Sequence, residues 1–371
     1  MYQPIHYKNA AMLLTLASVI ILCANISFAQ VDYSTFDYPA AMGASNGPTG
    51  VRGTGGQDVY ITGTWDSNGS HGLLYEGPLT GGGQSGQWTV LDFPSSGCFT
   101  VTGTVLYGPD AFPPNNVRLV GSYTRTETGC PTPTPTPAQN HGLLYEGPPD
   151  GSGTWQTLDF PPPMGETVLN TIPHSTMGGL VVGNFDTDHA TGRAFVYDID
   201  ADHWVELIKP GAISITAYGI WYNGGTQYTI AGGYSDGNLS GIDHGYLVNW
   251  DSATQTASDW TSYDFNNRHI GVAVSHFNGI TGDNHGGFYL TGDWVGVIPP
   301  DAGAFFAHVR RTPARAFGEA HWTPIAYPSS PGLSVDATGG DTVFENNVIG
   351  IYTANSTHIT HGFVARVLGH R

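Results

Sequence analysis

The stretch Gly63-Thr64-Trp65, a glycine, a variable residue and an aromatic, recurs along the whole chain. The other copies are Gly121-Ser122-Tyr123, Gly183-Asn184-Phe185, Gly232-Gly233-Tyr234, Gly292-Asp293-Trp294 and Gly350-Ile351-Tyr352. Successive glycines of this triplet are 58, 62, 49, 60 and 58 residues apart. Such a period is too long for most solenoid repeats and fits one four-stranded blade. The repeat therefore predicts an all-β fold, a six-bladed β-propeller of four-stranded blades.

Two further motifs accompany each triplet. A strand opened by histidine and glycine follows it, with the histidine at His71, His141, His244 and His361 and with Arg193 and Gly303 in the two remaining repeats. An outer strand then starts with tryptophan and ends with aspartate and an aromatic residue, as in Trp88–Pro94 and Trp155–Pro161. Apolar and polar residues alternate in these stretches, which is the pattern of strands. We expect the histidines to cap loops, with a ring of metal or ligand contacts as the alternative.

The start of the mature chain matches the outer-strand motif. Residues Tyr33–Pro39 have this pattern, whereas the sixth histidine-glycine strand ends near Val367 and no outer strand follows it. We therefore expect the N-terminal strand to complete the last blade, with three strands from the C-terminal segment and one from the start. This closure would leave no exposed sheet edge.

The inner strand of each blade should precede its triplet. We expect these six strands to begin near Gly43, Cys98, Gly165, Ile213, Arg268 and Gly332. Most residues in them are small and uncharged, so the few charged ones stand out as candidates for function.

The N-terminal 29 residues have the pattern of an export signal. Lys8 precedes an apolar core, Ala10–Ala24, and Ser27-Phe28-Ala29 has the small-x-small form of a cleavage site. The core is shorter than the roughly 20 residues that cross a bilayer, so a retained anchor is the weaker alternative. We expect a secreted or periplasmic protein in which residues 1–29 are the signal peptide and residues 30–371 form a single propeller domain.

The charge of the chain restricts its partners. The formal net charge is −18, with only 12 Lys and Arg among 371 residues. A surface of this sign repels phosphate backbones and anionic membranes, so we expect no nucleic acid partner and no membrane insertion. We expect a monomer whose partner is an extracellular glycan or protein.

Two cysteines remain after removal of the signal. Cys98 and Cys130 fall in loops of one repeat, and an oxidising compartment would allow them to pair. We predict this disulfide, with two separate free thiols as the alternative. The run Cys130–Pro137 alternates proline and threonine and predicts a short polyproline II arm, either a stiff insertion or a contact with a partner.

The repeat motifs resemble those of the bacterial extracellular HAF-repeat proteins, which carry a His-Ala-Phe signature beside glycine-aromatic and aspartate-aromatic-proline segments. The similarity covers all six repeats and is clear at Arg193-Ala194-Phe195 and in the segments ending at Pro39, Pro94 and Pro161. Arg193 and Gly303 depart from the signature histidine, so that histidine is not needed in every blade. The resemblance implies export and a repeat fold, and it brings no catalytic residue.

Candidate catalytic and binding residues interrupt the small, neutral inner strands. Acid–base chemistry needs two groups directed at one bond from different elements. Glu166, His269 and Asp336 are therefore candidates for catalysis in a hydrolase or lyase, with solvated charges around a water-filled channel as the alternative. For ligand binding the candidates are Arg268, His276, Trp221 and Asp110.

Clustered aspartates suggest a metal site as a further candidate. They are Asp186, Asp188, Asp200 and Asp202, and alternate carboxylates can surround Ca²⁺ with hard oxygen ligands. Neither the segment with Asp186 and Asp188 nor the segment with Asp200 and Asp202 is an EF-hand loop. The alternative is that these are solvated aspartates in turns. No zinc-protease, P-loop, nucleophile-elbow or dinucleotide motif is present in the sequence.

The sequence thus predicts a secreted β-propeller that binds a glycan or protein through the loops on one face. The competing hypothesis is a carbohydrate-active hydrolase or lyase with acidic residues at the central funnel. The two differ in whether Glu166, His269 and Asp336 converge in one concave pocket.

Overall fold

The described part of the chain consists almost entirely of β-strands. The computed structural model describes residues 30–128, 139–237, 242–265, 271–298 and 301–369. Within these ranges the helical content is one short 3-10 helix, η2 (Pro39–Ala41). No helix there is long and apolar enough to cross a membrane. The all-β prediction is confirmed, and the predicted signal peptide lies outside the described residues.

The strands form antiparallel sheets of consecutive elements. One sheet contains β2 (Asn46–Gly53), β3 (Val59–Asp66), β4 (Ser70–Gly77) and β5 (Gln87–Val90). The next contains β6 (Phe99–Phe112), β7 (Asn116–Glu127), β8 (His141–Gly147) and β9 (Thr154–Thr157). A third contains β10 (Val168–Met177), β11 (Leu180–Thr187), β12 (Arg193–Asp198) and β13 (His203–Leu207).

Two further groups of four strands are joined into one larger sheet. The first group contains β14 (Ser214–Gly224), β15 (Gln227–Ser235), β16 (Asp243–Asp251) and β17 (Thr256–Tyr263). The second contains β18 (Val272–Gly282), β19 (Phe288–Gly296), β20 (Ala302–Arg311) and β21 (Phe317–Ile325). They meet at one parallel pair, Asp243 with Val274.

The remaining sheet brings the two ends of the described chain together. It contains β22 (Val335–Phe344), β23 (Asn347–Ala354), β24 (Ile359–Val367) and β1 (Val31–Thr35). The strand β1 pairs antiparallel with β24, from Val31 opposite Val367 to Thr35 opposite Phe363. The N-terminal strand and the last three strands therefore share a sheet.

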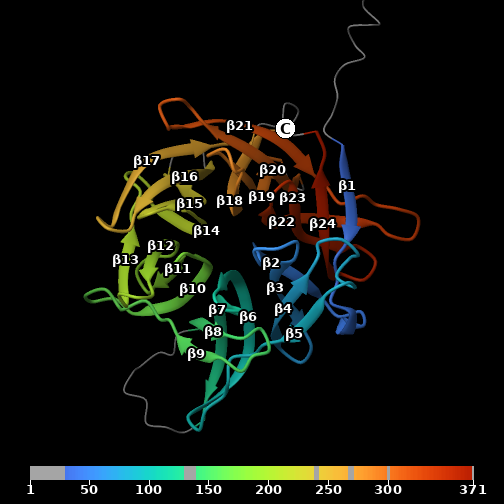
Figure 1. Cartoon of the computed structure of the whole chain (residues 1–371), viewed down its shortest axis with the longest axis horizontal. Helices are drawn as coiled ribbons and strands as arrows, with labels where there is room; N and C mark the ends of the chain where they lie inside the picture. Colours follow the sequence, from blue (N-terminus) through green and yellow to red (C-terminus); the bar gives the residue numbers. More distant parts are fainter. Residues whose placement is uncertain (1–29, 129–138, 238–241, 266–270, 299–300, 370–371) are drawn as a thin grey trace, which may run out of the picture.

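The sheets are arranged around a common centre in a propeller-like fold (Figure 1). The first strand of each group lies innermost and contacts the next in cyclic order: β2 with β6, β6 with β10, β10 with β14, β14 with β18, β18 with β22 and β22 with β2. These six inner strands begin within four residues of the predicted positions. Their start positions could be predicted because turn residues and the triplet spacing bracket each of them.

Aromatic residues of two repeat motifs meet between adjacent sheets. The aromatic of the outer strand stacks on the triplet aromatic of the following repeat, as in Phe93 on Tyr123, with ring centroids 3.9 Å apart. Phe160 and Phe185 stack in the same way at 3.8 Å. In the third repeat the outer aromatic is replaced by Lys209, whose ammonium lies 4.0 Å from the centre of the Tyr234 ring. The triplet aromatic is buried in every repeat except the first, and it packs adjacent sheets together.

The repeated histidines bond to the repeated aspartates. The Nδ1 atom contacts the carboxylate at 2.6–2.9 Å in the pairs His71–Asp92, His141–Asp159, His244–Asp264 and His361–Asp37. In three of the pairs the aspartate also accepts the backbone N–H of the glycine after the histidine, as Asp37 does from Gly362 at 3.0 Å. Where Arg193 and Gly303 replace histidine, Ile208 and Ala326 occupy the aspartate position. Both partners are lost together, so the histidine has a structural role, although its hydrogen-bond partner is a side chain rather than only backbone.

Removing one such aspartate should loosen the N-terminal strand. Asp37→Ala deletes two hydrogen bonds that fasten the segment after β1 to β24, and we expect the free energy of unfolding to fall by about 2 kcal/mol. Urea denaturation would measure this. Asp32→Ala, at an exposed position of β1, is the control and should change stability by less than about 0.5 kcal/mol. Equal effects of the two variants would contradict the assigned role.

Candidate functional site

Each inner strand carries a β-bulge at the same structural position. One residue of the inner strand is left without a partner directly after the residue that faces the triplet glycine. The six bulged residues are Thr49, Tyr107, His174, Tyr218, Asn278 and Asp341. We call these six residues the central ring. They comprise five residue types, threonine, tyrosine (twice), histidine, asparagine and aspartate, in contrast to the repeated residues around them.

The triplet glycine makes room for the bulge. A Cβ at Gly292 would lie 1.8 Å from the backbone oxygen of His276 in the inner strand, and one at Gly232 would lie 2.0 Å from that of Thr216. No side chain fits at such distances, so only glycine permits this close approach. The triplet glycine is therefore required because the inner strand, which carries the central ring residue, lies too close for any side chain at that position.

The central ring residues contact one another around the axis. The rings of Tyr107 and His174 have centroids 4.9 Å apart, and those of His174 and Tyr218 are stacked at 3.7 Å. Tyr218 also meets His276 edge-on at 4.6 Å. His276 in turn contacts Asn278, with its Nδ1 atom 2.6 Å from the amide oxygen. These side chains form a continuous chain of contacts across the four inner strands β6, β10, β14 and β18.

The variable middle residue of the triplet contacts the central ring. Asn184 contacts the Nε2 atom of His174 through its amide oxygen at 2.6 Å. Asp293 accepts a hydrogen bond from the amide of Asn278 at 2.8 Å and another from the backbone N–H of Gly340 at 2.9 Å. The invariant glycine of the triplet thus allows the close approach of the inner strand. The variable middle residue can bond to the central ring, as Asn184 and Asp293 do.

Burial sets the charge of the titratable groups in this site. It lowers the pKa of His174 to about 3 and that of His276 to about 4, so both imidazoles are neutral at pH 7. Burial also raises the pKa of Asp293. For Asp341, burial and then the negative charge of Asp293 raise the pKa well above its ordinary value, and its Oδ2 atom is buried without a hydrogen-bond partner. The two acids therefore form a like-charge pair.

An arginine spans the space between the inner strands. The buried guanidinium of Arg52 donates to the backbone oxygen of Ile220 at 2.6 Å and to the hydroxyl of Ser175 at 3.2 Å, and so connects β2 with β14 and β10. The cavity next to it is narrow, about 20 Å³, and four central ring residues line it, Thr49, His174, Tyr218 and Asn278. This space suits a water molecule and is far too small for a sugar ring.

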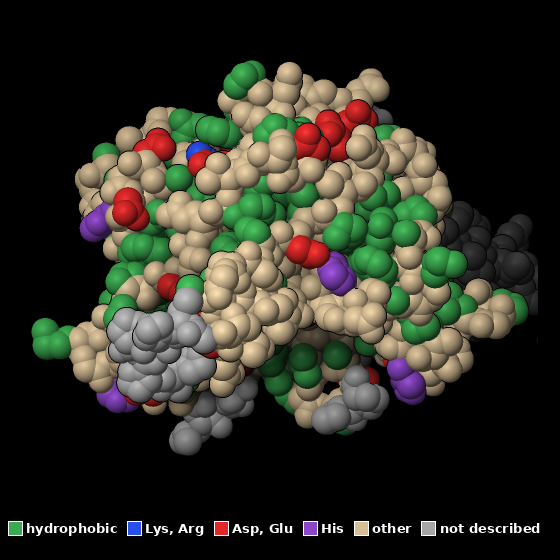
Figure 2. All heavy atoms as spheres, turned by 90° about the horizontal axis from the view of Figure 1, so that it is seen from below, with side chains coloured by type: hydrophobic (Ala, Val, Ile, Leu, Met, Phe, Trp, Pro, Cys, Tyr) green, Lys and Arg blue, Asp and Glu red, His purple; other side chains and the backbone are tan. Residues whose placement is uncertain are grey.

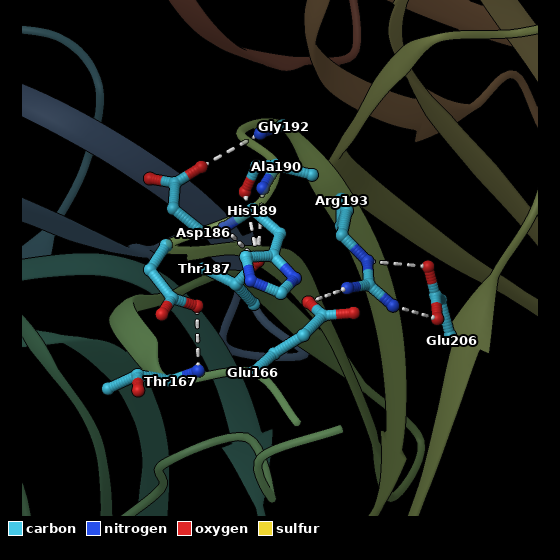
Figure 3. A network of polar contacts seen from close by, with 10 residues as sticks. Glu166, Thr167, Asp186, Thr187, His189, Ala190, Gly192, Arg193 and Glu206 are labelled. Carbon is cyan, nitrogen blue, oxygen red and sulfur yellow. Dashed lines mark hydrogen bonds and ion pairs between the residues drawn. The ribbon is translucent and has the colours of Figure 1, made fainter. Parts of the chain in front are cut away.

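The candidate catalytic residues are not brought together in the described structure. Glu166 lies before β10 and bonds through its carboxylate to Arg193 at 2.7 Å, and Arg193 also pairs with Glu206 at 2.7 Å (Figure 3). Asp336 is exposed near the start of β22, on a different sheet. His269 lies outside the described residues. Glu166 is thus held in an ion-pair network with Arg193 and Glu206. Nothing in the described residues brings Glu166 and Asp336 together in one pocket.

Three of the four candidate ligand-binding residues lie near the axis. His276 contacts Thr216, Tyr218 and Asn278 as part of the chain of contacts at the centre. The Trp221 ring lies 5.7 Å from the Arg52 guanidinium. Burial raises the pKa of Asp110, an effect opposed by Arg52, and Asp110 accepts the backbone N–H of Gly178 at 3.0 Å. The fourth candidate, Arg268, lies outside the described residues, as does Cys130, so the Cys98–Cys130 disulfide remains a prediction.

Three of the four aspartates predicted for calcium accept hydrogen bonds within the protein. Asp186 accepts the backbone N–H of Gly192 at 2.8 Å (Figure 3). Asp188 accepts the backbone N–H of Thr167 at 2.8 Å. Asp202 accepts from the hydroxyl of Tyr197 at 3.0 Å, and Asp200 lies in the turn between β12 and β13. Within the described ranges, no three His, Cys, Asp or Glu side chains gather in a way that could hold a metal ion. Calcium binding by these aspartates therefore stays a prediction, without a cluster of metal ligands in the described residues to support it.

Most exposed aliphatic side chains lie at one edge of the sheets, which we call the loop face. It comprises the loops before the inner strands and those after the second strand of each sheet. Prominent among its residues are Met42, Met164, Ile213, Val297 and Ile298, all more than half exposed. Of the large hydrophobic residues exposed in the described structure, only Tyr222 lies at the opposite edge. Figure 2 shows the molecule from its rim, where acidic side chains are far more common than basic ones.

Sequence reasoning selected none of the six central ring residues. Apart from the two tyrosines, Tyr107 and Tyr218, the six share no residue type, so no motif search finds them. A positional signal does exist, because each central ring residue lies either 14 or nine residues before its triplet glycine.

Comparison with known proteins shows that the fold of this chain is similar to that of solved structures. No protein-family model matches the chain, and no curated protein sequence matches it significantly. A protein of unknown function from Dyadobacter fermentans has a similar structure, with 10% sequence identity, a TM-score of 0.52 and coverage of 91% of this chain and 99% of that one. Trypanosoma rangeli sialidase in complex with the inhibitor DANA is also similar, with 9% identity and a TM-score of 0.51. The match covers 92% of this chain and 60% of the sialidase chain.

Proposed function

We propose that this chain is a secreted, six-bladed β-propeller of the HAF-repeat type that binds an extracellular protein through its loop face. The mature protein begins near Gln30, and residues 30–371 form one domain. The cyclic contacts of the six inner strands and the pairing of β1 with β24 support six blades closed by the N-terminal strand. The similar solved structures support a propeller-like fold and leave the function open.

The distribution of exposed aliphatic residues carries the functional proposal. Met42, Met164 and Ile213 precede three different inner strands, and the loop after β19 adds Val297 and Ile298. Because antiparallel strands alternate in direction, the start of the first strand and the end of the second lie at the same edge of a sheet. Hydrophobic side chains exposed together on one face are typical of an interaction surface.

The chemistry of these residues favours a protein over a glycan as the partner. Sugars are bound by flat aromatic faces, whereas Met, Ile and Val gain free energy by packing against other apolar side chains. The most exposed of the large hydrophobic residues are Met42 at 94% and Met164 at 101%, and neither is aromatic. A protein partner with an apolar patch would cover them.

The catalytic alternative lacks a supporting arrangement. Glu166 is paired with Arg193, Asp336 is on a different sheet, and the axial cavity holds little more than a water molecule. No pair of acids that could flank a glycosidic bond is assembled from the proposed residues in the described structure.

A pair of matched variants tests the loop face. The double variant Met164→Asp/Ile213→Asp places charges on the loop face, and Tyr222→Ser changes the exposed residue at the opposite edge. We expect the double variant to bind the secreted protein partner at least about tenfold more weakly, a loss of ~1.4 kcal/mol, and Tyr222→Ser to bind like the wild type. The measurement is quantitative capture of proteins from the culture medium on the immobilised chain, run beside a glycan array and a polysaccharide degradation screen.

Each outcome of this experiment decides between the hypotheses. A protein captured by the wild type and by Tyr222→Ser, and lost with the double variant, supports the proposal. If the wild type binds a glycan on the array and the double variant does not, the partner is a glycan rather than a protein. Degradation of a polysaccharide would restore the hydrolase or lyase hypothesis.

A further inference from the structure

The axis of the molecule is accessible from the loop face and closed beyond the central ring. Two positions before each central ring residue, the inner strands carry a half-buried residue: Gly47, Val105, Ile172, Thr216, His276 and Gly339. The two residues that follow each central ring residue are buried in all six strands. Because the inner strands begin at the loop face, their accessible half is the half nearest to it. We call this accessible half of the axis the funnel, and the central ring forms its floor.

Tight packing of the inner strands closes the far side of the floor. The residue after the central ring residue is glycine in four of the six strands. A Cβ at Gly50 would overlap the backbone oxygen of Tyr107, and one at Gly279 would lie 2.6 Å from the Cα atom of Thr342. The space left there is the cavity of about 20 Å³. A ligand from outside therefore reaches the floor from the loop face.

The floor of the funnel carries negative charge. Asp341 is a central ring residue, and Asp293 accepts the backbone N–H of the residue before it, Gly340, at 2.9 Å. The charges of both acids act on the hydroxyl of Tyr218, and that of Asp341 also acts on Tyr107. Among the described residues, no Lys or Arg opposes the charge of either acid. From their first residue to the central ring, the six inner strands contain no Lys or Arg. The floor therefore attracts a cation.

The repeat shows that Asp341 lacks a partner that its counterparts have. In the third repeat the middle residue of the triplet, Asn184, bonds to the central ring residue His174 at 2.6 Å, and the fifth repeat has the equivalent bond. In the sixth repeat this middle residue is Ile351, whose side chain cannot form a hydrogen bond. The Oδ2 atom of Asp341 is buried without a hydrogen-bond partner. The chain itself thus leaves an acid at the floor of the funnel unsatisfied.

A cation at the floor would offset the electrostatic cost of this acid. Burial, and then the charge of Asp293, raise the pKa of Asp341, so its ionised form is costly in the free protein. A positive group in contact with the carboxylate stabilises the ionised form. The acid that destabilises the free protein would therefore stabilise a complex with a cationic ligand.

The surface of the funnel favours a lysine side chain as this cation. Val105 and Ile172 are half-buried in its wall, and such apolar groups suit the methylene stem of lysine. Tyr107 and Tyr218 at the floor present aromatic rings and hydroxyl groups, which attract an ammonium group. The ammonium group is compact and can direct its three donors to separate oxygens, whereas the planar guanidinium of arginine needs a wider site.

We propose that a lysine of the protein partner enters the funnel and that its ammonium group pairs with the carboxylate of Asp341. Met42, Met164 and Ile213 precede three of the inner strands and so lie at the entrance, where the same partner would cover them. This inference rests on the proposed function and adds the chemistry of the group that the partner inserts.

A small amine tests the funnel without the partner. The probe is n-butylammonium chloride, which corresponds to the side chain of lysine, and the reference is sodium chloride at the same concentration. At pH 8 and about 100 mM, we expect the amine to raise the unfolding temperature of the mature protein by about 2 °C over sodium chloride, because it binds the folded state. Asp341→Asn should abolish this rise, and Asp336→Asn, an exposed change in the same strand, should retain it.

Three results of this measurement would overturn the proposal. They are the absence of a rise in the wild type, an equal rise in Asp341→Asn, and a larger rise with n-propylguanidinium, which would assign the site to arginine instead of lysine.

Capture of the partner separates this inference from the proposed function. Asp341→Asn should weaken capture at least about tenfold, because a buried, hydrogen-bonded ion pair is lost, and Asp336→Asn should leave it unchanged. If the wild type and Asp341→Asn capture the same protein equally well, the lysine inference is wrong and the proposed function stands. If the amine stabilises the wild type but no protein is captured, the proposed function is wrong, and the partner's lysine with it.

Discussion

Replacing Gly292 by alanine is expected to destabilise the fold more than any surface change, by more than about 4 kcal/mol, or to prevent the protein from accumulating in folded form. The added Cβ would lie 1.8 Å from the backbone oxygen of His276 and 2.8 Å from its carbonyl carbon. Both atoms belong to the main chain of β18, so no rotation of a side chain relieves the overlap. β18 would have to move away from β19, which would break the bulge that places Asn278 at the centre.

A second glycine provides the control for this prediction. Gly97 has no atom within 4 Å of its Cβ position, and Gly97→Ala should change stability by less than about 1 kcal/mol. Thermal unfolding followed by circular dichroism would measure both variants. If Gly292→Ala melts within a few degrees of the wild type, the close approach of β18 and β19 is not required for folding.

The sequence predicted the fold because the repeat motifs act locally and recur. Tight turns, alternating strands and the triplet glycines mark the inner strands to within four residues. The outer-strand motif in residues 33–39 pointed to the pairing of β1 with β24, because the same motif ends other repeats. The reason for the glycine was not visible, since it depends on a carbonyl in the neighbouring strand.

The site was harder to predict because the bulge interrupts the alternation of side chains. One extra residue in a strand changes which face the following residues occupy. Counting alternate positions along β10 or β22 therefore misses His174 and Asp341. Charged residues such as Glu166 and Asp336 stood out in the sequence instead, although one is ion-paired and the other exposed. His276 stood out in the sequence as an unusual inner-strand residue, but its contacts with Tyr218 and Asn278 follow only from the structure.

Replacing Asp341 by asparagine is expected to stabilise the protein at neutral pH. Burial and the charge of Asp293 raise the pKa of Asp341 well above its ordinary value, and its Oδ2 atom has no partner. A carboxyl group whose pKa is raised on folding imposes no cost below its unfolded pKa near 3.8, and the cost grows as pH rises towards the folded pKa. Each unit of the shift corresponds to ~1.4 kcal/mol. Asp341→Asn removes this cost.

The pH dependence separates this effect from that of the buried histidines. His174 and His276 have lowered pKa values, about 3 and about 4, so the stability they confer is present above pH 6.5 and is lost as pH falls. Each histidine should contribute a slope of ~1.4 kcal/mol per pH unit between pH 6 and its folded pKa. Asp341→Asn should therefore raise the free energy of unfolding at pH 8, lose its advantage near pH 4 and leave the histidine-dependent fall below pH 6 in place. Asp336→Asn, an exposed change in the same strand, should alter neither region, and a stability gain for Asp341→Asn that is independent of pH would mean that packing rather than charge is responsible.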